Sequence, residues 1–427
     1  MLVADMVRLL TASAAALWLV CPASGHAQDL QHAPMEKMDH ELRADDDASP
    51  WRLHVDGTLF ATLNVQGGRR GDTDFRSQNW LMVMGTHALG RGTVTLTGMF
   101  SAEPLTVGQP GYSSIFQEGE SYHGLQITDH QHPHDLFMQL SAAWRVPLGR
   151  GLHATLAAAA VGDAALGPPA FMHRPSSAEN PTAPLSHHVF DSTHLASSVM
   201  FAGVDRGPVT LEGSVFHGRE PDENRYDLDF GAPDSWSARL WLRLGSDWTL
   251  QASHGYLHQP ELLEPGDQRR TNVSLSWFRQ RGNTYSAAMV AVGQNARRYS
   301  TVGAVLVEAT RRFERVTIYG RAERTEVETE ILLFPTIVHV PHPGELVDAV
   351  GAFTAGGIRD VVRLKGVVIG VGADASWYTV PPLLRVTHGD HPMSAHVFVR
   401  VAPAQFGTRM WNMTMGGAMR TQSAHHH

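Results

Sequence analysis

The sequence predicts an all-β fold, a transmembrane antiparallel up-and-down β-barrel of about sixteen strands. Three observations predict it. Segments between Trp51 and Ala402 alternate apolar and polar residues, tight turns and long polar loops separate these segments in regular order, and most segments are long enough to cross a membrane as strands.

Tight connections set the strand number. Each lies between two β-rich runs, as the turn of a β-hairpin does. They occupy residues 89–92, 148–151, 205–207, 245–247, 279–283, 312–315 and 359–365. Seven hairpins follow from these seven turns.

Longer connections, rich in Gly, Pro, Asp and His, separate the hairpins. They lie near 65–77, 104–134, 164–193, 218–235, 258–269, 295–300, 327–347 and 379–393. Eight long and seven short connections make sixteen strands. Short turns at one end and long loops at the other are typical of barrels whose turns face the periplasm and whose loops face the outside of the cell.

The period within the strands agrees with a barrel in lipid. In the segment 236–244, Trp236 and Leu240 share one face while Arg239 and Arg243 share the other. Apolar and polar residues alternate poorly in the segments near 285–291 and 302–310. We assign these segments as strands because the neighbouring strands need partners for their backbone hydrogen bonds. The alternative is a soluble sandwich or propeller, which buries its apolar face inward.

Aromatic residues near the ends of the predicted strands are candidates for interfacial girdles. They are Trp80, Trp144, Trp248, Trp277, Tyr285, Trp377 and Tyr378.

The ends of the chain differ from its centre. Residues 1–27 predict a secretory signal peptide, because Arg8 precedes an apolar run and small residues surround the expected cleavage site at Ala27. Residues 28–50 predict a disordered periplasmic tail, 51–402 the barrel, and 403–427 a C-terminal tail. The one cysteine, Cys21, lies in the signal, and a net charge of −8 argues against nucleic-acid binding.

The export signal, the sixteen-strand rhythm and the turn-loop asymmetry together resemble bacterial outer-membrane β-barrel proteins over residues 51–402. The stretches 129–137 and 212–225 are similar to an uncharacterised exported family, and that similarity implies no activity. The barrel resemblance implies a location in the bacterial outer membrane, with outer-membrane lipid and the barrel-assembly machinery as partners.

Histidines concentrate in the long loops. In the stretch 129–135 an extended backbone would project His130, His132 and His134 to one side, and imidazoles with a carboxylate suit copper or zinc. A second group could converge on the first across the loop-side mouth. The predicted metal ligands are His130, His132, His134, Asp135, His187, His188 and His194. The alternative is that these residues hydrogen-bond a folded loop.

Methionines offer softer ligands. Met35 and Met38 in the leader tail, and Met413 and Met415 after the last strand, carry thioethers of the kind that suit monovalent copper.

Charges at inward positions could set the ion preference of an aqueous lumen, or could pair across strands and fill it. The predicted lumen-lining residues are His54, Asp56, Arg145, Glu212, Arg239, Arg243, Arg321, Glu323, Asp374 and Arg400. The acidic loop 220–229 is either a cation site or a solvated loop.

Three hypotheses of function follow. The first is a porin-like channel for small polar solutes or ions with a His-rich extracellular mouth. The second is an outer-membrane copper- or zinc-binding protein of metal homeostasis, and the third is a closed structural barrel or adhesin. We expect no enzyme, because the sequence has no G-x-S-x-G or H-E-x-x-H motif. His217 and His254 also lie on faces opposite to Ser214 and Ser253.

Overall fold

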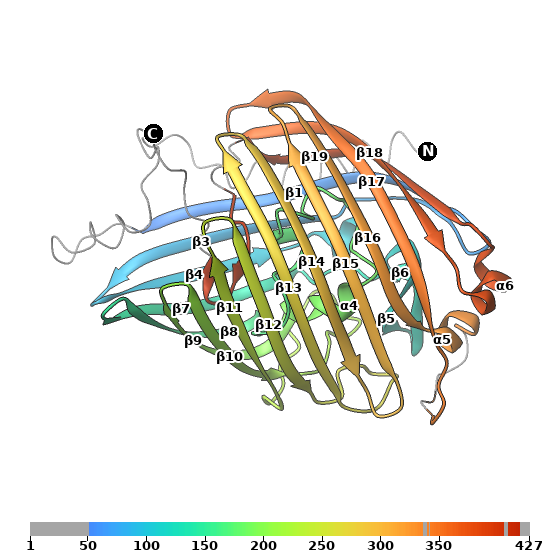
Figure 1. Cartoon of the computed structure of the whole chain (residues 1–427), viewed down its shortest axis with the longest axis horizontal. Helices are drawn as coiled ribbons and strands as arrows, with labels where there is room; N and C mark the ends of the chain where they lie inside the picture. The colour runs from blue at the N-terminus through green and yellow to red at the C-terminus, as the bar shows by residue number, and fades with distance from the viewer. Residues whose placement is uncertain (1–50, 336–339, 341, 405–408, 419–427) are drawn as a thin grey trace.

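One closed antiparallel sheet forms the wall of the molecule (Figure 1). The computed structural model describes residues 51–335, 340, 342–404 and 409–418. Seventeen strands share the sheet, and the short β2 (Thr73–Arg76) pairs with β1 alone, which leaves sixteen barrel strands. β1 (Arg52–Gln66) pairs with β19 (Met393–Pro403), and this pairing closes the barrel. The predicted fold class is confirmed.

The other barrel strands pair in sequence order. They are β3 (Asn79–Leu89), β4 (Gly92–Phe100), β7 (Phe137–Gly149), β8 (Leu152–Gly162), β9 (Ala196–Arg206), β10 (Val209–His217), β11 (Ser235–Leu244), β12 (Trp248–Leu257), β13 (Gln268–Arg281), β14 (Thr284–Ala296), β15 (Thr301–Arg312), β16 (Val316–Glu328), β17 (Val347–Leu364) and β18 (Val367–Thr379). All seven tight turns occur, at what we call the turn end of the barrel, and the eight long connections occur at the loop end. The last turn lies later than predicted, since β17 continues to Leu364.

Short elements lie in the connections or inside the barrel. They are α3 (Glu103–Thr106), β5 (Tyr112–Tyr122), β6 (Leu125–Gln131), η1 (Phe171–His173), α4 (His187–Phe190), η2 (Ser192–Leu195), α5 (Thr329–Leu333), η3 (Pro382–Leu384), α6 (Arg385–His388), β20 (Met413–Thr414) and β21 (Gly417–Ala418). Figure 1 shows α5 and α6 together at the loop end. No helix among the described residues is both long enough and apolar enough to span a membrane.

The outer wall of the barrel is apolar. Leu156, Leu240 and Phe353, on strands far apart around the wall, all expose their side chains, while their strand neighbours face inward. A belt of exposed apolar side chains around a closed sheet is unfavourable in water and suits contact with lipid acyl chains.

Three of the predicted girdle aromatics are wrongly placed, and one of them, Tyr378, lies on the inward face of β18 against Phe116 of β5. Trp80 and Tyr285 are buried inside the barrel rather than exposed on its outer rim. Tyr285 packs against Trp411, and Trp80 packs against His173, so both rings cover segments that enter the lumen. Trp144, Trp248 and Trp377 are exposed, as an interfacial position requires.

The connection between β8 and β9, residues 163–195, folds into the barrel, and we call it the inner loop. All of its residues are buried except Leu185, His188 and Ser192, which are partly buried. It descends from the loop end to the turn end, where the Thr310 hydroxyl donates to the backbone oxygen of Ser176 (2.8 Å). It then returns to the loop end, where Asn295 donates to the backbone oxygen of His188 (2.9 Å).

The inner loop explains the weak alternation of two strands. The inward faces of β14 and β15 include Val302 and Leu306, which pack against Val189 and Phe190 of the loop. In the burial pattern these strands alternate as the others do. Their inward residues are apolar because a protein segment, rather than water, covers them.

Residues 409–418, which we call the C-terminal segment, also lie in the lumen. The Arg409 guanidinium contacts Asp56 on β1 (2.9 Å), and the Trp411 ring packs on Phe278 and Tyr285. The backbone N–H of Asn412 donates to the backbone oxygen of His173 in the inner loop (2.9 Å). The two inserted segments therefore meet inside the barrel.

The β5–β6 hairpin covers the loop end. Near β1 the Asn64 amide donates to the backbone oxygen of Ser113 (2.7 Å), and near β16 the Glu118 carboxylate accepts from the backbone N–H of Glu328 (2.8 Å). The hairpin thus bridges distant parts of the rim.

We expect Arg174→Met to release the inner loop. Arg174 is buried between Asp191 and Glu308 (Arg174 Nε to Glu308 Oε1, 2.8 Å), so its loss leaves two buried carboxylates without a cation, which costs about 3–5 kcal/mol. Proteolysis with a broad-specificity protease should cleave between residues 163 and 195 faster, while circular dichroism retains the strand signal. The exposed Arg206→Met is the control, and equal protection of both variants would contradict the anchoring role.

Candidate metal centre

Five histidines meet in the lumen, from two parts of the chain. His132 and His134 lie between β6 and β7, and His187, His188 and His194 lie in α4 and η2 of the inner loop. Successive ring centroids are 5.5 Å apart for His134 and His194, 5.5 Å for His194 and His187, 5.3 Å for His187 and His188, and 5.6 Å for His188 and His132. We call this series of neighbouring rings the histidine cluster.

Hydrogen bonds at Nδ1 orient most of these rings. Nδ1 of His134 donates to Glu103 (2.9 Å), and Nδ1 of His187 donates to Asp191 (2.6 Å). Nδ1 of His194 donates to the backbone oxygen of Asp191 (2.7 Å). An imidazole held in this way presents Nε2 as its free lone pair, as metal-binding histidines do.

Several ring nitrogens in the cluster have no hydrogen-bond partner among the described residues. They are Nε2 of His132, His134 and His194, and both nitrogens of His188. All are buried, and a buried polar atom without a partner costs roughly 1–3 kcal/mol. This concentration of unsatisfied ring nitrogens in one place is what a bound cation would relieve.

Burial also controls the charge of the cluster. It lowers the pKa of His132, His188 and His194 well below the usual value, so these rings are neutral at neutral pH. Burial opposes charge on His134 as well, but the adjacent Glu103 carboxylate outweighs it and the pKa of His134 is raised. Neutral imidazole is the form that binds metals.

A small cavity lies beside the cluster. It has a volume of about 30 Å³ and is lined by Trp80, Glu103, His132, His134, Phe171 and Met172, among others. That volume accommodates an ion with a water molecule.

The cluster is not closed around an ion-sized point. Among the described residues, the one group of three His or acidic side chains whose ligand atoms all lie within 4.8 Å of one another is Asp222, Asp227 and Asp229, in the exposed loop predicted as a cation site or a solvated loop. Metal binding at the histidine cluster therefore requires imidazole rings to rotate toward the cavity.

The structure does not bring all seven predicted ligands together. β6 ends at Gln131, so the alternation that would align His130 with His132 and His134 stops there. His130 instead hydrogen-bonds the backbone oxygen of Thr128 (3.1 Å). Asp135 pairs with Arg225 (3.1 Å), and burial raises its pKa to about 7.

Three carboxylates that position the rings were not among the predicted metal ligands. Asp191 follows His187 by four residues, and this spacing could have predicted the contact between them, because side chains four residues apart on a helix are neighbours. Glu103, and Glu120 at 3.2 Å from Nδ1 of His132, are remote from the histidines they contact, and no local pattern marks them.

The predicted lumen charges are mostly buried and paired. Arg239 contacts Glu212 on β10 (2.7 Å) and Asp163 at the start of the inner loop (3.0 Å). Arg400 contacts Asp360 (3.0 Å) and also Glu179 in the inner loop.

The remaining predicted lumen residues have two environments. Asp56, Arg321, Glu323 and Asp374 are buried and have ion-pair partners at Arg409, Glu323, Arg321 and His396 respectively. His54, Arg145 and Arg243 are partly exposed near the turn end. The buried charges bind one another or the inserted segments.

The serines considered for catalysis anchor the inner loop. Ser214 accepts from the backbone N–H of Ala165 (3.0 Å), and Ser253 accepts from that of Gly167 (2.9 Å). Both are buried, whereas His217 and His254 are not.

The fold is that of bacterial outer-membrane β-barrels of the porin type. OmpTΔL8, a loop L8 deletion mutant of the Vibrio cholerae outer-membrane protein OmpT, has a TM-score of 0.51 and 8% identity, and the match covers 82% of this chain and 99% of that one. OprB of Pseudomonas putida has a TM-score of 0.51 and 10% identity, with 83% and 94% covered. No protein-family model and no curated protein matches the chain.

We expect Glu103→Gln to lower the pKa of His134, because burial would then act without the opposing carboxylate. Hydrogen–deuterium exchange at the histidine C2 position, followed by mass spectrometry across a pH series, measures this value. Glu223→Gln, in an outer loop, should leave it unchanged. An unaltered His134 titration in Glu103→Gln would show that Glu103 does not control the ring.

Proposed function

We propose that this protein is an outer-membrane barrel that binds a transition-metal ion, copper or zinc, at the histidine cluster inside its lumen. The observation that supports this most strongly is the set of buried ring nitrogens without partners, held beside a cavity by hydrogen bonds at the opposite nitrogen. Imidazole is a preferred ligand of both metals.

The alternative, that the histidines serve loop architecture alone, explains the Nδ1 contacts but not the unsatisfied Nε2 atoms. Single unpartnered nitrogens also occur elsewhere, such as Nδ1 of His173, and the cluster differs in gathering five of them on four neighbouring rings. Asp191 supports the metal interpretation further, because it orients His187 and His194 at once.

The metal proposal makes a direct test possible. Isothermal titration of the purified barrel with Zn²⁺ and with Cu²⁺ should detect a stoichiometric site that a triple variant, His132→Ala, His188→Ala and His194→Ala, loses. The leader and C-terminal histidines are the same in every sample and cancel in the comparison.

The matched control is His217→Ala with His254→Ala, which removes two imidazoles outside the lumen. It should bind as the unchanged protein does. Equal stoichiometry and affinity in the triple variant would remove the metal assignment and favour a closed structural barrel.

Passage of small polar solutes or ions is the second candidate function, and the porin-type wall favours it. The inner loop continues into β8 and β9 at its two ends. Between these ends only hydrogen bonds, ion pairs and packing hold it to the wall, so it can move without breaking the chain. We propose that solutes pass when the inserted segments move aside.

In planar bilayers we expect the intact protein to give small or rare current steps, because the inner loop and the C-terminal segment occupy the lumen. Replacing residues 168–190 with a short Gly-Ser linker should give large and steady steps. Large steady steps from the intact protein, at the same frequency as from the variant, would refute a gated lumen.

A further inference from the structure

A second group of possible ligands lies in the lumen next to the histidine cluster. One buried cluster contains many of the chain's sixteen methionines. Its methionines, which we call the thioether cluster, are Met82, Met99, Met138, Met172, Met410 and Met413. They come from β3, β4, β7, the inner loop and the C-terminal segment.

The register of the wall brings three of these side chains together. Met82 on β3 lies directly opposite Met99 on β4, and both are buried on the inward face. On the other side of β4, Met99 pairs with Gln139 of β7. Met138 is the residue before Gln139, and the β4–β7 pairing shifts its register at this point. Side chains opposite each other in a sheet are close neighbours, so these thioethers share one patch of wall.

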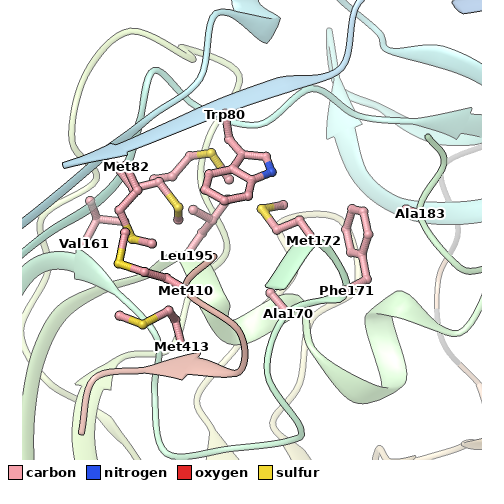
Figure 2. Packing of buried hydrophobic residues seen from close by; sticks show 12 residues of the cluster. Trp80, Met82, Val161, Ala170, Phe171, Met172, Ala183, Leu195, Met410 and Met413 are labelled. Carbon is pink, nitrogen blue, oxygen red and sulfur yellow. The ribbon is translucent and has the colours of Figure 1, made fainter. Parts of the chain in front are cut away.

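The C-terminal segment brings two more thioethers to this patch. Figure 2 shows Met410 and Met413 grouped with Met82 on one side of Trp80, with Met172 on the other. Asp56 fixes this placement, because it accepts from the backbone N–H of Met410 (2.8 Å) and pairs with Arg409.

The concentration of methionine is specific to this cluster. The five other buried apolar clusters contain only Met289 and Met415 between them, and use Ala, Val, Leu, Ile and aromatic residues instead. Methionine fills irregular gaps in cores, but elsewhere in this barrel an inserted segment packs against the wall with at most one methionine in each cluster. Packing alone therefore does not account for the composition of this cluster.

We propose that the thioether cluster is a binding site for a soft monovalent cation, Cu(I) or Ag(I), centred on Met82, Met410 and Met413. Thioether sulfur is a soft ligand that suits Cu(I) and binds Zn²⁺ poorly. The site uses side chains other than those of the histidine cluster and selects a soft monovalent ion, whereas the histidine cluster is tested with Zn²⁺ and Cu²⁺, so it does not require the metal centre proposed above. Met172, which also lines the cavity beside His132 and His134, makes the two groups contiguous.

The test uses the full-length barrel in detergent, with ¹³C-labelled methionine methyl groups and Ag⁺ as the probe. Ag⁺ needs no reductant, and methyl resonances report each methionine separately, so the leader methionines Met35 and Met38 do not confuse the result. We expect Ag⁺ to shift the resonances of the proposed ligands Met82, Met410 and Met413 and of their cluster neighbours Met99 and Met138, and Zn²⁺ to leave all five in place.

The variant that removes the site is Met82→Leu, Met410→Leu and Met413→Leu, because Leu and Met exchange with little change in volume. It should lose the Ag⁺-dependent shifts of Met99 and Met138. The control is Met200→Leu with Met393→Leu, whose side chains are exposed by 54% and 50% on the outer wall. This control variant should keep the Ag⁺-dependent shifts of Met99 and Met138.

The experiments can contradict either proposal without contradicting the other. The histidine triple variant should keep the Ag⁺ shifts, and the methionine triple variant should keep Zn²⁺ binding. The thioether site would be overturned if Ag⁺ shifted only the resonances of the leader or outer-wall methionines. It would also be overturned if the histidine triple variant lost the Ag⁺ shifts of the thioether cluster, whatever the result for Zn²⁺.

Discussion

Buried ion pairs between the barrel wall and the segments inside it hold this structure together. A closed sheet of sixteen strands encloses a space wide enough for water, and this wall points charged residues into that space. Arg239, Arg400 and Asp56 meet opposite charges on the inserted segments. A buried charge without a partner is strongly unfavourable, so wall and insertions depend on one another.

The same anchors decide where the imidazoles lie. No barrel strand contributes a ring to the histidine cluster; the rings come from the inner loop and from the connection that leads into β7. Ser186 donates to Glu323 on β16 (2.7 Å), and Asp191 pairs with Arg174, which is itself fixed to β15. The wall thus acts as a rigid frame for a centre built on loops, and carboxylates one contact away set the orientation of the rings.

Local patterns in the sequence predicted the wall well and the interior poorly. Turn chemistry and strand period depend on neighbouring residues, so the seven turns and sixteen strands were accessible. The course of residues 163–195 depends on partners more than a hundred residues away, such as Glu308 and Arg321. The weak alternation near 302–310 was the available signal, because apolar inward residues require a cover. In the site, the grouping of His187, His188 and His194 was visible, whereas the contacts of Glu103 and Glu120 were not.

The position of the C-terminal segment separates the wall of the barrel from part of what fills it. The seam between β1 and β19 runs from Gln66 and Ser394 to Leu59 and Val401, and β19 pairs with β18 as far as Pro403, so the strand pairing of the wall does not involve residues 409–418. A chain that ended at Pro403 would retain its lipid-facing surface yet would leave Asp56 without its cation and part of the lumen empty. The lipid-facing wall and this part of the lumen's filling are therefore formed by different stretches of the sequence.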